Sequence, residues 1–124
     1  MRQENVHYFT DKEEKFANLL IGIGVRKNVA TVLVFLVNVQ EATSREIERG
    51  TGLRQPEASI AIKYMTEQGW IKCQAILSER QGRPVKKYYL KIPVKEIVAA
   101  LETSKKSEVN NQLARIRKMR DYLP

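Results

Sequence analysis

A capping pattern followed by two glycines constrains the fold of this chain more than any other feature. Thr43, with Glu46 three residues later, matches the box in which a threonine and a glutamate cap the start of a helix. That helix is expected over residues 44–49 and is followed by Gly50 and Gly52, whose backbone freedom suits a helix end. The candidates for its N-terminal cap are Thr43, Ser44 and Arg45.

A second helix is predicted directly after this turn, over about residues 55–68. Pro56 suits its first turn because the proline ring fixes φ near the helical value, and Leu53 in the turn can plug the core. Small and apolar residues recur at helical spacing along one face, namely Ala58, Ala61, Ile62 and Met65. A short helix, a tight turn and a longer helix with small residues at the crossing predict a helix-turn-helix.

Segments on both sides of this motif complete the order of elements. Helices are predicted over residues 11–21 and 27–39, and the second is apolar on nearly every side, which is typical of a core or an interface. Strand patterns in residues 69–79 and 85–92 predict a hairpin whose projecting wing spans about residues 77–92. Together they predict an α+β, mainly α, winged helix-turn-helix fold with N- and C-terminal dimerisation helices.

The segments "LIGIGVRKNVATVLVFLVNVQEATSREIERGTG" and "MTEQGWIK" resemble the DNA-binding domain of TrmB-type transcriptional regulators, winged-helix proteins common in archaea. The MarR and ArsR families share the plan more loosely. The resemblance covers roughly residues 17–92 and implies a recognition helix at 55–68, a wing at 77–92 and a homodimer. The segment "LRQPEASIAIKYM" departs from the usual "PRSRVYEVL", so no target sequence carries over. Only residues 93–124 follow the wing, so the sugar-binding domain of TrmB proteins, and a sugar effector, are not expected.

The recognition helix carries side chains suited to the major groove of double-stranded DNA. The candidate contacts are Arg54, Gln55, Glu57, Ser59, Ile60 and Lys63. Gln55 can pair with adenine, and Ile60 can contact a thymine methyl group if it is exposed. Arg54 and Lys63 suit phosphate or guanine, and the Ser59 hydroxyl suits a base or a phosphate. Glu57 can accept from cytosine, but a negative charge placed to suit the helix dipole is the favoured alternative.

The segment "RQGRPVKKYY" is expected to form the tip and return strand of the wing. Its candidate DNA contacts are Arg80, Gln81, Gly82, Arg83, Lys86 and Lys87. Gly82 permits a tight turn, and the arginines on either side of it suit a narrow, A·T-rich minor groove. The alternative is a solvated hairpin rim without a ligand.

The last part of the chain predicts a helix that needs a partner. Residues 1–10 are expected to be a tail, 11–92 the DNA-binding domain and 93–124 a C-terminal dimerisation helix. Apolar residues recur in that helix at spacings close to those of a coiled coil, which favours a dimer over docking on the same domain. The predicted dimer-interface residues are Phe16, Leu20, Ile97, Leu101, Val109, Leu113, Ile116, Met119 and Leu123.

The charge of the chain points to a polyanion. The net charge is +8 and the pI about 9.7, with the excess beyond the first quarter of the sequence. A basic domain of this size fits nucleic acid, so the main hypothesis is a homodimeric, sequence-specific regulator that binds double-stranded DNA. The rivals are a winged-helix protein–protein adaptor and a non-specific nucleic-acid or chromatin binder.

Other classes of function lack a supporting pattern in the sequence. The sequence has one histidine, His7, and one cysteine, Cys73, which together cannot make a metal site. For Cys73, the role of a small strand residue is favoured over that of a redox sensor. No nucleophile–base pair or phosphate loop is present, so neither an enzyme nor a cofactor is expected. The first residues lack the apolar region of a secretory signal, and no apolar run could span a bilayer, so we expect a cytoplasmic protein without a membrane partner.

Overall fold

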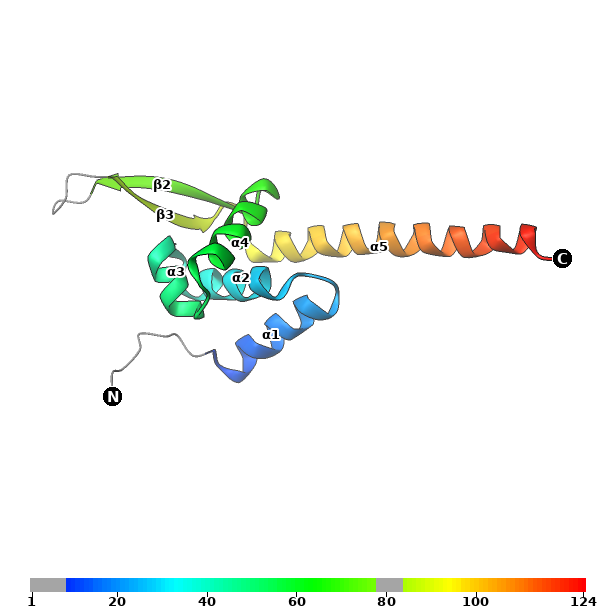
Figure 1. Ribbon diagram of the computed structural model, residues 1–124, viewed down its shortest axis with the longest axis horizontal. Coiled ribbons are helices and arrows are strands. Elements are labelled where there is room, and N and C mark those ends of the chain that lie inside the picture. The colour runs from blue at the N-terminus through cyan, green and yellow to red at the C-terminus, as the bar shows by residue number, and fades with distance from the viewer. Residues whose placement is uncertain (1–8, 78–83) are drawn as a thin grey trace. The chain divides into compact units, whose positions relative to one another are not determined.

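Helix α2 (Lys27–Val39) is at the centre of the core (Figure 1). The computed structural model describes residues 9–77 and 84–124, and the chain forms two compact units, Met1–Ile92 and Pro93–Pro124. Buried residues occur on every side of α2: Val29, Ala30, Val32, Leu33, Val34, Phe35 and Leu36. A helix that is apolar all round must be covered all round, so the first unit is arranged about α2.

Helix α1 (Asp11–Gly22) starts at a capping box and packs on α2. The Thr10 hydroxyl accepts from the backbone N–H of Glu13 at 3.2 Å, and the Glu13 carboxylate accepts from that of Thr10 at 2.7 Å. The helix predicted here is confirmed. The assignment of Leu20 to a dimer interface is wrong, because this side chain is 4% exposed and belongs to the domain core. Phe16 is half-buried and keeps some accessible surface.

Helix α3 (Ser44–Thr51) starts at the capping box predicted from the sequence. The Thr43 hydroxyl accepts from the backbone N–H of Glu46 at 3.1 Å, and the Glu46 carboxylate accepts from that of Thr43 at 2.8 Å. Thr43 is therefore the N-cap, whereas Ser44 and Arg45, predicted to share this position, are the first two residues of the helix.

The end of α3 differs from the prediction. Gly50 does not end the helix but lies inside it, buried against Phe35, and a Cβ atom built at Gly50 would overlap the Phe35 ring. Gly52 is the residue that ends α3, with a left-handed φ of 75°. The two glycines thus serve different needs, one a close approach of α3 to α2 and the other a change of backbone direction.

A three-stranded antiparallel sheet completes the first unit. It consists of β1 (Glu41–Thr43), β2 (Ile71–Leu77) and β3 (Pro84–Leu90), in the order β1-β3-β2. In the register, Ala42 of β1 and Cys73 of β2 lie on either side of Tyr88. The hairpin of β2 and β3 was predicted and β1 was not. The mainly helical winged helix-turn-helix fold is confirmed.

The second unit consists of α5 (Val94–Met119) and a short 3-10 turn, η1 (Arg120–Tyr122). Helix α5 continues through the polar stretch that separates its two apolar segments. Ile97, predicted at a dimer interface, is buried. Leu101 is half-buried, and the remaining predicted interface residues are exposed: Val109, Leu113, Ile116, Met119 and Leu123.

In the part of the chain that the structure describes, no helix combines the length and apolar character needed to cross a bilayer.

Substitution of Gly50 tests the packing of α3 on α2. We expect Gly50→Ala to lower the free energy of unfolding by about 1–3 kcal/mol, because the added methyl group must displace the Phe35 ring. Gly22→Ala is the matched control. Nothing lies within 4 Å of a Cβ at Gly22, so alanine there should be neutral or stabilising by up to about 1 kcal/mol. Urea denaturation followed by circular dichroism measures both, and a Gly50→Ala variant as stable as wild type would contradict the packing.

Candidate nucleic-acid interface

Helix α4 (Gln55–Glu67) is the predicted recognition helix, and it lies across α2 with one face buried (Figure 1). The predicted inner residues are all buried: Ala58, Ala61, Ile62 and Met65. The predicted outer residues are all exposed: Gln55, Glu57, Ser59, Ile60 and Lys63. The helical spacing thus separates a core face from a polar face. Ile60 is an apolar side chain on the polar face, and at 62% exposed it is available to a ligand.

Hydrogen bonds within the turn fix α4 relative to α3. The Thr51 hydroxyl donates to the carbonyl of Ile47 at 2.6 Å and accepts from the backbone N–H of Leu53 at 3.3 Å. Gly52 supplies the left-handed residue between them, and Leu53 is half-buried. The turn is therefore held by side-chain and backbone bonds rather than by glycine alone, and it orients the start of α4.

Glu57 serves the start of α4 itself. Its carboxylate accepts from the backbone N–H of Arg54 at 2.9 Å, which satisfies a donor that the helix cannot pair internally. The structure therefore favours the capping role over the predicted contact with cytosine. The Arg54 side chain, at the N-cap position, is left exposed.

The helix-turn-helix carries several exposed cations. Exposed basic residues lie on α3, on the turn and on α4: Arg45, Arg49, Arg54 and Lys63. Within residues 9–77 and 84–124, none of these four side chains makes an ion pair. Their charges are therefore available to an anion from outside the chain.

The wing is described in part. Lys86 on β3 is exposed, as expected of a phosphate contact. Lys87 is instead engaged within the sheet, because its ammonium group lies 3.2 Å from the Glu41 carboxylate of β1. That pairing makes Lys87 a weaker candidate for DNA contact than the sequence suggested. The other predicted wing contacts lie outside the described residues: Arg80, Gln81, Gly82 and Arg83.

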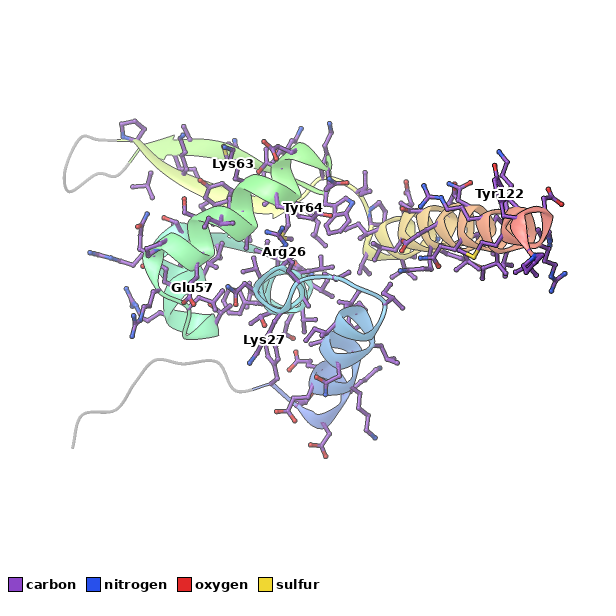
Figure 2. The ribbon with its side chains drawn as sticks, turned by 45° about the vertical axis from the view of Figure 1, so that its right-hand side comes forward. Arg26, Lys27, Glu57, Lys63, Tyr64 and Tyr122 are labelled. Atoms are coloured by element: carbon purple, nitrogen blue, oxygen red, sulfur yellow. The ribbon has the colours of Figure 1, made fainter. Side chains whose placement is uncertain are left out.

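The fold also brings to α4 three residues that sequence reasoning missed. Arg26, Lys27 and Asn28 at the start of α2 line a hollow of about 300 Å³ together with Glu57, Ile60 and Tyr64 of α4, among others. Figure 2 shows Arg26 between the start of α2 and the side of α4 that carries Tyr64. These residues precede α4 by almost thirty positions, so only the packing of α2 on α4 places them here. The one signal in the sequence was a basic pair at a helix start.

A comparison with models of protein families identifies the family of the chain. A model described as MarR family matches residues 23–84, which is 62 of 124 residues and so half of the chain. The chain belongs to the MarR family. The match spans α2, β1, the helix-turn-helix and β2, so it includes the candidate interface. The MarR family is a family of transcription regulators rather than of enzymes. A comparison with curated proteins finds no match.

Solved structures similar to this MarR-family chain have the same fold. A possible transcriptional regulator from Methanosarcina mazei has a TM-score of 0.59 at 12% identity, covering 78% of this chain and 83% of its own. A transcriptional regulator homologue from Pyrococcus horikoshii has 0.51 at 16%, covering 82% and 97%. A MarR family regulator from Silicibacter pomeroyi has 0.51 at 14%, covering 90% and 82%. At these identities the likeness shows the fold alone.

The described part of this MarR-family chain contains no set of side chains that could bind a metal ion. No group of three or more histidine, cysteine, aspartate or glutamate side chains gathers there in a way that could hold an ion. Cys73 is a free, exposed thiol on β2.

Removal of the α3 cap tests how the helix-turn-helix is held. We expect Thr43→Ala to lower the free energy of unfolding by about 1 kcal/mol, because the hydroxyl that accepts from the Glu46 N–H is lost. Ser44→Ala is the control, since Ser44 is exposed and the described hydrogen bonds of the cap do not use its hydroxyl. Thermal and urea melts of both variants give the comparison, and equal stabilities would show that the cap does not hold α3.

Proposed function

We propose that the chain is a homodimeric, sequence-specific regulator of transcription that binds double-stranded DNA. Helix α4 enters the major groove, and the β2–β3 hairpin lies along the neighbouring minor groove. The observation that supports this most is the division of α4 into a fully buried inner face and an exposed outer face. A helix held in this way presents its outer side chains to a groove with little loss of conformational entropy on binding.

The outer face of α4 combines base reading with charge. Gln55 is placed in the first turn, where an amide can pair with adenine, and the exposed Ile60 can cover a thymine methyl group. Arg54 and Lys63 supply the cations for phosphate or guanine, and Ser59 adds a hydroxyl. We leave Glu57 out of the reading set because it caps the helix.

The wing and the classification within the family are parts of the same proposal. Arg80 and Arg83 remain the candidates for minor-groove contact, with Lys86 on the flanking phosphates. Residues 17–92 also resemble TrmB-type domains, and this finer assignment stays a prediction, as does a location in the cytoplasm.

The proposed dimer is formed by α5. Its exposed apolar residues Val109, Leu113, Ile116 and Met119 recur at steps of four, three and three, which places them along one side of the helix. Leu123, predicted to continue this stripe, lies beyond η1 in extended backbone. An isolated helix gains little stability from such a stripe, whereas a second copy would bury it. Phe16 of α1 is a further candidate, whereas Leu20 is excluded by its burial in the core of the first unit.

Two variants test the role of α4. One should lower the preference for a particular DNA sequence, and the other should lower the affinity for all duplexes. We expect Gln55→Ala to cost about 1–3 kcal/mol on a preferred sequence and little on other sequences, because the amide reads a base edge. Lys63→Ala should weaken binding to all sequences and reduce the slope of log affinity against log salt concentration by about 1, because a phosphate contact is lost. Fluorescence anisotropy with a preferred and a scrambled duplex measures both effects. Equal losses on both duplexes for Gln55→Ala would contradict base reading by α4.

A charge placed in the apolar stripe of α5 tests the dimer. We expect Leu113→Glu to raise the dimer dissociation constant by roughly 10-fold or more, because the carboxylate would be buried against the partner. Asn111→Glu introduces the same side chain on the opposite side of the helix, so it should leave the dimer intact. Sedimentation velocity at several concentrations distinguishes the two. A monomeric wild-type protein, or the same effect from both variants, would contradict a dimer held by this stripe.

A further inference from the structure

The hollow beside the middle of α4 forms a surface that the helix-turn-helix motif does not include. Its walls are the first residues of α2 and the side of α4 that carries Ile60 and Tyr64 (Figure 2). Arg26 and Lys27 are exposed at its rim, and neither makes an ion pair among the described residues. The surface is therefore cationic and adjoins the side of α4 that is proposed to read bases.

The groups around this hollow are those that proteins use to hold a phosphodiester. Four of the residues that line it carry side-chain hydrogen-bond donors: Arg26, Lys27, Asn28 and Tyr64. Arginine, lysine, asparagine and tyrosine all bind phosphate oxygens in protein–DNA interfaces. The Tyr64 ring packs edge-on to Trp70, with ring centroids 5.9 Å apart, and Trp70 is buried, so the position of Tyr64 is fixed by the core.

Glu57 is the acidic residue among the described ones that line the hollow, and its carboxylate already accepts a hydrogen bond. Glu57 directs a carboxylate oxygen to the backbone N–H of Arg54. Among the described residues that line the hollow, Arg26 and Lys27 carry two positive charges and Glu57 carries one negative charge, so the sum is positive. An anion has a net attraction to this surface, whose apolar lining residues are Val29, Ile60 and Ala61.

The geometry of a helix in a groove identifies the anion. The major groove is about 12 Å wide, so a helix seated in it is flanked on both sides by the phosphate backbones. Arg45 and Arg49 lie on α3 and Arg54 is the N-cap of α4, whereas Arg26 and Lys27 line the hollow with Glu57, Ile60, Ala61 and Tyr64 of α4. The cations on α2 thus meet the backbone at a different point along the groove from those on α3.

We propose that Arg26 and Lys27, with Asn28 and Tyr64, form a second phosphate-binding surface that holds the DNA backbone beside the middle of α4. This inference rests on the proposed function, because it requires α4 to enter the major groove. The surface positions the duplex and carries no sequence preference, since phosphates are the same at every step. It explains why α2, a core helix, begins with two exposed cations.

The test is the salt dependence of DNA binding by a double variant. Arg26→Ala with Lys27→Ala should make the slope of log affinity against log salt concentration shallower by about 2, because each lost phosphate contact removes about 0.9. Affinity at 0.1 M salt should fall by roughly 10- to 50-fold, and equally on preferred and scrambled duplexes. The swap Arg26→Lys with Lys27→Arg keeps both charges and should keep the slope. Circular dichroism melts check that each variant is folded.

A control variant that loses the same charge at another place distinguishes a local phosphate contact from the effect of the net charge of the protein. Lys12→Ala with Lys15→Ala removes the same charge from α1, which packs on α2, and it should leave the slope unchanged. If the α2 variant keeps the wild-type slope, or if both double variants change it equally, the proposed surface is wrong and the function of α4 still stands. If the wild-type chain shows no salt-dependent binding to DNA, the proposed function itself fails, and this inference with it.

Discussion

The burial of α2 is the interaction on which the rest of the structure depends. Its fully buried residues include Val32, Leu33 and Leu36, and each such side chain contributes about 1.5–3 kcal/mol when it leaves water. Because apolar groups occur around the whole helix, α1, α3, α4 and the sheet are all needed to cover it. Helix α4 uses its apolar stripe for this purpose, so only its polar face is left for a ligand. The core thereby determines which side chains can meet DNA.

Short-range hydrogen bonds around the turn hold α3 and α4 in position. The hydroxyls of Thr43 and Thr51 satisfy backbone groups at the start of α3 and between α3 and α4, and Glu57 does so at the start of α4. These residues are polar, yet their role is to hold the helices rather than to bind a partner. The exposed side chains that make none of these bonds include cations at the start of α2, on α3 and on α4. This distribution suits a partner with charge repeated along its length.

The sequence predicted the helices closely because their ends carry chemical signals. Capping boxes and the left-handed glycine are local, and the apolar run of residues 27–39 had no other stable place than a core. It missed β1, because a strand of three residues has no period and exists only through pairing with β3. It also misjudged Gly50 and Leu20 and did not single out Arg26, because the surroundings of all three depend on which element packs beside them. Such tertiary neighbours have no signature along the chain.

Selection of bound sequences from a random duplex pool, at two salt concentrations, tests the central claim most directly. The account predicts a two-fold-symmetric motif, with half-sites separated by about one helical turn, that persists as salt rises while bulk binding falls. Recovery of duplex without a motif would contradict sequence reading by α4. Recovery of nothing at either salt concentration would contradict DNA binding altogether and would favour a role in binding proteins.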